Sequence, residues 1–294
     1  MTTVDVALIT QFSDILHVKS QQIQSRLRKS FKMIPMVGDK FAYDGLGSVE
    51  AREVSGRLVK TVFDDIEHLR RKIKRRRFVV TLPIDASDVR GMLLNPQGPY
   101  AEACVRAMER VYDRVGIEAA FANVDTGRDF ETEVTFANDG GNTVTGTGGL
   151  TYEKLLEIRK FWRNNEVGQE IPEEMLFLIT GDEEDALLKE TELISGDYSR
   201  QFVVDKGEIQ MAAGLKLVCY GADVPNPLLA VASGVRSCIA LTGRGLVYGL
   251  SKAMGVSVDE RKDYIETSQV QIVGELGAVR TEGLLVQKVT TTTA

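Results

Sequence analysis

Hydrophobic residues recur at steps of three and four in the segment that follows Pro99. The members of this stripe are Tyr100, Cys104, Ala107, Met108, Val111, Val115 and Ala119. That spacing places them on one side of an α-helix. The other side carries charged residues, namely Glu102, Arg106, Glu109, Arg110, Asp113 and Arg114. The apolar spacing predicts one long helix over residues 99–122. Pro99 can stand at its start, because a proline in the first helical turn loses no hydrogen bond.

Short apolar runs bounded by turn residues predict strands on either side of this helix. Residues 78–83 form one such run, which we expect to stop at Pro83 because proline cannot donate to a strand ladder. Further strands are predicted at residues 175–179, 213–220, 236–241, 265–272 and 284–289, with a break at residues 274–277. Two further helices are expected, one capped by Thr151 with a Leu150–Leu155 staple, the other opened by Thr180 and Glu183.

The first 80 residues have weaker patterns. Ile9, Phe12, Leu16, Ile23 and Leu27 share one face of a predicted N-terminal helix, which cannot bury that face by itself. Apolar residues are then spread thinly over residues 38–77, among glycine, serine and charged side chains. This pattern favours an extended two-stranded loop, and a lone hairpin needs a surface to lie on.

A run of basic residues ends this loop. Seven of the eight positions from 70 to 77 are basic, namely Arg70, Arg71, Lys72, Lys74, Arg75, Arg76 and Arg77. Such a block could bind nucleic acid, form a solvated charged face, or dock on an acidic neighbouring copy of the chain. We favour docking and predict that these seven side chains form an inter-subunit contact.

Composition narrows the protein class. The chain has 294 residues, of which 43% are hydrophobic and 27% charged, as in a folded protein of one large or two ordinary domains. No stretch approaches the ~20 apolar residues of a membrane span, and the N-terminal residues lack a signal-peptide pattern. Three cysteines without metal-ligand spacing indicate reduced thiols. The net charge of −6 argues against a dedicated DNA-binding protein.

Candidate chemistry is sparse. His17 and His68 lie in contexts typical of solvated surface residues. Residues 140–149 are rich in glycine but lack the lysine and hydroxyl residue of a phosphate-binding loop, so a turn is the favoured interpretation. Asp182, Glu183, Glu184 and Asp185 could hold a cation, yet acidic residues at a helix start are favoured by the helix dipole alone. We therefore expect no catalytic residue, no cofactor and no metal site.

The ordered set of segments resembles a known family. The set begins with the strand, turn and long helix of residues 78–122 and continues with Gly148-Gly149-Leu150-Thr151, Asn165-Glu166-Val167, Phe177-Leu178-Ile179-Thr180, Asp185-Ala186-Leu187-Leu188 and Glu192-Leu193-Ile194-Ser195-Gly196-Asp197-Tyr198. In order and spacing these segments are similar to those of major capsid proteins of tailed bacteriophages, over nearly the whole chain.

This resemblance implies an α+β protein with the Hong-Kong-97-type capsid fold. Its parts would be an N-terminal arm (residues 1–38), an extended loop (39–80), a peripheral domain with the long backbone helix (81–122 and 256–294) and an axial domain (123–255). The extended loop would lap over the adjacent subunit.

The resemblance also implies a function and partners. The chain would assemble with itself, through hexamers and pentamers, into an icosahedral shell that encloses double-stranded DNA. A portal protein would be a partner, and scaffolding or decoration proteins are further candidates. The protein would reside in the virion, and in the host cytoplasm during assembly, without a membrane partner. Two alternatives stay open, namely the shell subunit of an encapsulating nanocompartment and an α/β enzyme with a site near residues 140–149.

Overall fold

The computed structural model describes residues 21–57, 60–61, 63–85, 97–146, 148–168, 174–190, 204–205, 208–229, 231–261, 263 and 267–292. The chain divides into two compact units. The first unit comprises Met1–Ser25, Arg76–Tyr112 and Ser251–Leu276, and the second comprises Arg26–Arg75, Asp113–Leu250 and Gly277–Ala294. Three of the five boundaries between the units fall within α3 (Gln97–Phe121), β15 (Leu246–Arg261) and β16 (Thr267–Arg280).

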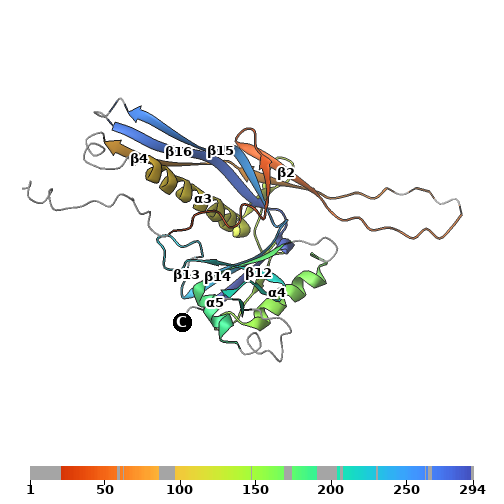
Figure 1. The fold of residues 1–294 in the computed structure, drawn as a ribbon. Helices are drawn as coiled ribbons and strands as arrows, with labels where there is room; N and C mark the ends of the chain where they lie inside the picture. Colours follow the sequence, from red (N-terminus) through yellow and green to blue (C-terminus); the bar gives the residue numbers. More distant parts are fainter. Residues whose placement is uncertain are drawn as a thin grey trace, which may run out of the picture. The chain divides into compact units, whose positions relative to one another are not determined.

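The first unit is built from a sheet and the long helix. β4 (Arg76–Asp85) pairs antiparallel with β16, and the neighbour of β16 in the same sheet is β15. Figure 1 shows α3 running alongside β4 and β16. The apolar stripe of α3 meets the sheet in a buried cluster of Ile84, Cys104, Met108, Val270 and Ile272. The long helix predicted over residues 99–122 is therefore present, and it begins two residues earlier, at Gln97.

Two predictions about these strands are wrong in detail. β4 does not stop at Pro83 but continues to Asp85, because β4 lies at the edge of its sheet, where proline is tolerated. β16 does not break at residues 274–277 but runs unbroken to Arg280. The two glycines serve close packing instead. A Cβ atom on Gly274 would lie 3.0 Å from Met108 Cε, and one on Gly277 would lie 2.2 Å from the Lys74 carbonyl oxygen.

The second unit contains a mixed seven-stranded sheet. Its main path runs in the order β11 (Met211–Ala212), β12 (Leu215–Tyr220), β8 (Met175–Thr180), β14 (Val235–Thr242), β17 (Val286–Thr292) and β7 (Asn142–Val144), with β13 (Val231–Ala232) paired to β14. β8 and β12 are parallel, whereas β14 runs antiparallel to both β8 and β17. A separate short ribbon pairs β9 (Val204–Asp205) with β10 (Glu208–Ile209), and η1 (Gly283–Leu285) precedes β17. The strands predicted at residues 175–179, 213–220, 236–241 and 284–289 correspond to β8, β12, β14 and β17.

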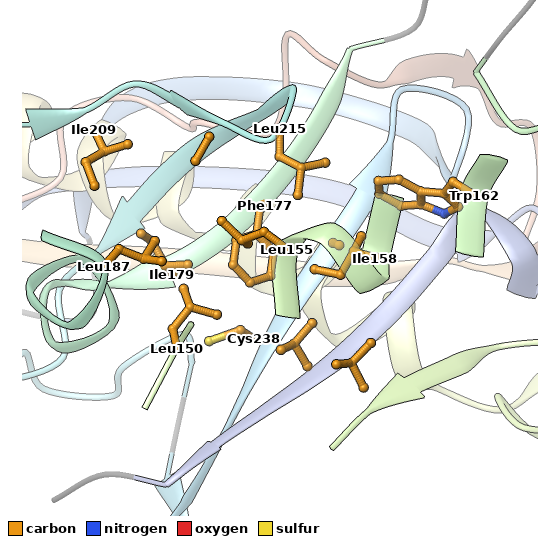
Figure 2. Close-up of a cluster of buried hydrophobic side chains, with 14 of the residues drawn as sticks. Leu150, Leu155, Ile158, Trp162, Phe177, Ile179, Leu187, Ile209, Leu215 and Cys238 are labelled. Carbon is orange, nitrogen blue, oxygen red and sulfur yellow. The ribbon is translucent and has the colours of Figure 1, made fainter. Parts of the chain in front are cut away.

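Two helices and this sheet enclose a large hydrophobic core. Leu155, Ile158 and Trp162 of α4 (Tyr152–Asn164) and Leu187 of α5 (Gly181–Leu188) pack against Phe177 and Ile179 of β8 (Figure 2). The predicted staple residues Leu150 and Leu155 are both buried. Thr151 precedes α4 as predicted, but its side chain makes no capping bond. The Tyr152 N–H donates to Glu190 Oε2 instead, at 3.3 Å. At α5 the Thr180 N–H donates to Glu183 Oε2 at 3.0 Å, as the capping pattern predicts.

The second unit also holds a four-stranded sheet in the order β2 (Lys40–Leu46), β3 (His68–Lys74), β5 (Val124–Thr126) and β6 (Thr132–Val134). Ile73 of β3 and Val124 of β5 belong to a small buried cluster with Met36, Val247 and Val279. Nearby, β1 (Lys32–Pro35) pairs in parallel with residues 247–250 of β15. This cluster anchors the paired end of β2 and β3.

The predicted N-terminal helix is absent from its described part. Residues 21–31 contain no helix, Leu27 is buried and Ile23 is 58% exposed. The backbone N–H groups of Arg26 and Leu27 donate to the Asp113 carboxylate, each at 3.1 Å, so these donors are satisfied without a helix of their own. Ile9, Phe12, Leu16 and His17 lie outside the described residues.

The two compact units divide the chain at other positions than the predicted parts, and the predicted domain division stays a prediction. Residues 256–294 were predicted to join the peripheral domain as a whole, but residues 277–294 fall in the second unit, because β17 pairs with β14 and β7. Residues 113–122 and 26–75 fall in the second unit as well. Of the predicted tail, residues 256–276 share a unit with β4 and the first part of α3.

Candidate functional site: the base of an extended hairpin

β2 and β3 form the base of a long hairpin. The strands pair antiparallel from Lys40 opposite Lys74 to Leu46 opposite His68, and the Gly47 N–H donates to the Glu67 carbonyl at 2.8 Å. All described residues from 48 to 67 lie outside helices and strands and are exposed, and they extend far from the strands in Figure 1. The two-stranded form predicted for residues 38–77 is thus present at the base of the hairpin.

The basic run occupies β3 and the start of β4, and one member of it is buried. Arg71 donates from Nη2 to Asp139 Oδ1 at 2.5 Å and from Nη1 to Asp139 Oδ2 at 2.8 Å. Arg280, which is fully buried, donates from Nε to the same Asp139 Oδ2 at 2.8 Å. Arg280 Nη1 also reaches the Ala120 and Ala122 carbonyls at 2.8 and 3.1 Å. One carboxylate therefore joins β3 and the end of β16, and Arg280 links them to the C-terminal end of α3.

The charge balance of this cluster is unusual. Two guanidinium groups share a single carboxylate, and Arg71 Nε and Arg280 Nη2 are buried without a hydrogen-bond partner among the described residues. Burial lowers the pKa of Arg280, while its hydrogen bond to Asp139 acts in the opposite direction. Among the described residues, Asp139 supplies the one carboxylate that pairs with these two cations.

Lys72 and Lys74 meet a second carboxylate on the same sheet. Both Nζ atoms lie 2.9 Å from Asp125 Oδ2 of β5. The hydrogen bonds from Lys72 and then Lys74 lower the pKa of Asp125, and burial opposes them. The two ion pairs hold β3 against β5, where the register provides only one paired position, Arg71 opposite Thr126.

This depressed pKa predicts an acid-sensitive contribution to stability. A carboxyl group with a folded pKa below its unfolded value of about 3.9 stabilises the fold above that pH, and the contribution disappears as the pH falls toward the folded pKa. We expect wild type to be more stable than Asp125→Asn at pH 6 and the difference to shrink below pH 4. Melting temperatures of both proteins between pH 6 and pH 3 would test this. A constant difference over that range would contradict the ion pairs.

The other basic residues face solvent and also have partners in their own chain. Arg70 donates to both Asp44 oxygens at 2.7 and 3.0 Å and lowers the pKa of Asp44 through that bond. Arg75 pairs with Asp39, and Arg77 Nε lies 3.7 Å from Glu275 Oε1. The Arg76 guanidinium lies 5.2 Å from the Phe78 ring centre. Most residues of the predicted inter-subunit set therefore pair with carboxylates of their own chain. Their contact with a neighbouring copy stays a prediction.

The remaining candidates for chemistry have structural roles where they are described. Gly140 adopts a positive φ of 81° in a turn, in which the Gly141 N–H donates to the Phe136 carbonyl at 3.0 Å. Asp182 and Glu183 both pair with Arg236, at 2.8 and 2.9 Å. His68 is an exposed residue of β3. Cys104, Cys219 and Cys238 are free thiols, and burial raises the pKa of Cys219 to about 11.

Within the described part of the chain, no group of three or more histidine, cysteine or acidic side chains could hold a metal ion. The described helices include none that is long and apolar enough to cross a membrane.

Sequence reasoning missed the residues that organise this site from a distance. Asp113 was placed on the polar side of α3, but it is fully buried and accepts a hydrogen bond from the Tyr220 hydroxyl at 3.1 Å as well as from the chain at residues 26–27. Asp139 and Arg280 also gave no sequence signal, because 141 residues separate them. A lone arginine at the end of a strand and a lone aspartate in a turn look like surface residues.

A family model described as phage capsid protein matches residues 4–292. The chain belongs to the phage capsid protein family. Among solved structures, the capsid protein of Helicobacter pylori bacteriophage KHP30 is similar, with 10% identity, a TM-score of 0.75, and coverage of 98% of this chain and 96% of that one. The capsid protein of the cyanophage P-SCSP1u has 11% identity, a TM-score of 0.74 and coverage of 100% and 96%. No curated protein matches.

The protein is a major capsid protein with the Hong-Kong-97-type fold, as the resemblance of its segments predicted, and it forms a shell. Its place is the capsid of the virion, and its family is one of structural proteins. The matched chain from Mycobacterium phage Che8 has the same fold, with 12% identity, a TM-score of 0.69 and coverage of 95% of this chain and 96% of that one.

Proposed function

We propose that this capsid protein assembles through hexamers and pentamers into an icosahedral shell around the double-stranded DNA of a tailed phage. Assembly would take place in the host cytoplasm, with a portal protein and with scaffolding or decoration proteins as further partners. No residue of the chain would be catalytic. The family match over residues 4–292 supports a shell, and the exposed hairpin supports the way in which its subunits join.

The observation that carries this proposal is the apolar surface of the hairpin. Phe63 is 89% exposed, Val54 is 63% exposed and Leu46 is 64% exposed. A single chain leaves these side chains in water, and a large exposed apolar side chain on a long arm is typical of a surface that another protein covers. The occupant we propose is the adjacent copy of the chain, over which the hairpin would lie.

The basic run would support this contact at the hairpin base. Arg71 is inside the second unit and would stay there, whereas Arg70, Arg75, Arg76 and Arg77 are more exposed and would reach acidic side chains of the neighbour. Exchange of an exposed pair within the chain for a pair between chains costs little, because exposed ion pairs contribute only about 0–1 kcal/mol each. Such contacts would weaken as the salt concentration rises.

Phe63→Asp is expected to prevent shell formation without unfolding the subunit. The substitution adds a charge at a residue that is almost fully exposed in the single chain, so its melting temperature should stay within about 2 °C of wild type, as for most surface substitutions. An aspartate buried under a neighbour would cost several kcal/mol without a cation partner. Negative-stain microscopy of both proteins, expressed alone and with phage scaffolding components, measures the outcome.

The matched control is Asp64→Asn, which changes the next residue, a partner of Arg52 in the same arm. This control should form shells like wild type. Normal shells from Phe63→Asp would contradict the role of the hairpin. Wild-type particles that hold protein cargo and no DNA would contradict the phage proposal and favour a nanocompartment.

A further inference from the structure

The second unit has chemically different surfaces at the two ends of its parallel strands. β8 and β12 run in the same direction, with Lys216 opposite Leu176 and Tyr220 opposite Thr180. A pocket lies where they begin and a polar turn lies where β12 ends. Six residues of strand separate the two places by about 20 Å, at about 3.3 Å per residue. A subunit with two unlike surfaces can join other copies head to tail.

The pocket at the first end is basic at its rim and apolar at its floor. It has a volume of about 510 Å³ and includes Arg159, Arg163, Trp162, Met175 and Gly214 in its lining. Trp162 is fully buried and its indole N–H donates to the Leu284 carbonyl at 3.0 Å, so this wall of the pocket is fixed. We call it the basic pocket.

One rim arginine of the basic pocket is held in place by the backbone. Arg159 Nη1 donates to the Ala213 carbonyl at 2.6 Å. Gly214, at a positive φ of 80°, leaves room for this guanidinium, since a Cβ atom there would lie 2.7 Å from Nη1. Among the residues that the structure describes, no carboxylate pairs with Arg159. Glu174, the nearest acidic residue in sequence to Met175, is bound to Lys216, which lowers the pKa of Glu174.

The turn at the other end carries the opposite charge and an apolar neighbour. Asp223 and Val224 follow β12 in a bend over residues 222–226, where both are exposed and Val224 is 50% exposed. In the described part of the chain no cation pairs with Asp223. We call these two residues the acidic tip. Asp223 also lines a groove with Asp182 and Glu184, in which Arg26 and Lys216 take part as well and Asp182 is paired with Arg236.

We propose that the acidic tip of one copy of this chain binds in the basic pocket of the next copy. The Asp223 carboxylate would meet the two rim arginines, and Val224 would cover Met175, the partly exposed apolar residue of the pocket lining. Arginine suits this role because its guanidinium donates two parallel hydrogen bonds to a carboxylate. Because the tip and the pocket are different surfaces, the contact is heterologous, and a heterologous contact forms a ring where its rotation closes. The inference rests on the proposed function, since it concerns how capsomers form.

A charge exchange tests this contact. Arg163→Glu and Asp223→Arg each place like charges in the interface, and each is expected to lower the yield of assembled rings or shells at least about tenfold. The double variant Arg163→Glu/Asp223→Arg restores opposite charges in every contact of the ring, so its yield should return to within about threefold of wild type. Native mass spectrometry gives ring sizes and sedimentation gives particle yield.

A mixture of the two single variants provides a stricter test. When copies of Arg163→Glu and Asp223→Arg alternate, every contact joins opposite charges. Alternation is possible only in rings with an even number of copies, so the mixture should form rings of six but not rings of five. Rings of both sizes, or no rings, from two folded variants would overturn the proposal.

The controls separate this inference from the proposed function. Lys160→Glu makes the same type of charge change on the same helix outside the pocket lining and should assemble normally. If wild type assembles and both single variants assemble equally well, the interface is wrong and the capsid function stands. If wild type forms no shells, the proposed function is wrong. Should a reversal unfold the subunit, Arg163→Gln and Asp223→Asn replace it, with an expected loss of about threefold and no rescue by each other.

Discussion

Asp139→Ala is expected to destabilise the subunit by about 3–5 kcal/mol, the usual cost when one partner is removed from a buried ion pair. The side chains of Arg71 and Arg280 that meet Asp139 are 5% and 0% exposed. Without the carboxylate, two buried cations would face each other in a region that water cannot reach. The repulsion would separate β3 from the end of β16. Against a typical total stability of about 5–15 kcal/mol, a loss of this size leaves much of the protein unfolded at 37 °C.

Urea unfolding of the unassembled subunit measures this effect. The matched control is Asp39→Ala, which removes the partner of Arg75 on the surface, where Asp39 is 79% exposed. That control should cost about 0–1 kcal/mol, because solvent screens the remaining charge. Equal losses in the two variants would show that the arginines do not depend on Asp139. If Asp139→Ala loses much more stability than Asp39→Ala, a fall in its shell yield follows from folding rather than from a surface contact.

The long helix shows which parts of this fold a sequence pattern can predict. Seven apolar positions at helical spacing between Tyr100 and Ala119 are a strong local signal, and the structure confirms a helix over the 25 residues Gln97–Phe121. The same pattern gave the wrong environment for Asp113. Its partners are the backbone of residues 26–27 and the hydroxyl of Tyr220, which lie 86 to 107 positions away in the sequence. Helical periodicity carries no information about such partners.

The basic run shows a similar limit on what the charge pattern of a sequence can predict. Its composition correctly drew attention to residues 70–77, but composition cannot tell a surface arginine from a buried one. The alternation of β3 turns Arg71 and Ile73 inward and leaves Arg70 and Lys74 nearer the solvent. The carboxylates that receive these cations, among them Asp39, Asp125 and Asp139, are scattered along the chain. The fold brings them to the basic run from the start of β2, from β5 and from the turn that follows β6.

Glycine in the tail was misinterpreted for a related reason. In sequence, two glycines within four residues favour a break in a strand. In the structure, a Cβ atom on Gly277 would collide with the backbone of Lys74, and one on Gly274 would make tight contacts, at 3.0 Å, with the side chains of Met108 and Met254. The residue type was the right signal, but its cause was packing rather than a turn. This difference can be measured.

Gly277→Ala is expected to destabilise the subunit by about 1–3 kcal/mol, the usual cost of inserting a methyl group into a tightly packed position. The added Cβ would lie 2.2 Å from the Lys74 carbonyl oxygen and 3.0 Å from Ile73 Cγ2. The first contact is with backbone, and Ile73 is fully buried in the cluster that anchors the hairpin. Neither neighbour can move without displacing β3, so the strain would reach the base of the hairpin.

Gly255→Ala is the matched control, because a Cβ at Gly255 of β15 would meet nothing within 4 Å. That substitution should leave stability unchanged or raise it by up to about 1 kcal/mol, because alanine reduces the freedom of the unfolded chain. Thermal unfolding of the two variants gives the comparison, and hydrogen exchange of the β3 amides locates the change. If Gly277→Ala had the same melting temperature as Gly255→Ala and kept its β3 amides protected, β16 would have room for a methyl group beside Lys74. Close packing would then not explain the glycine.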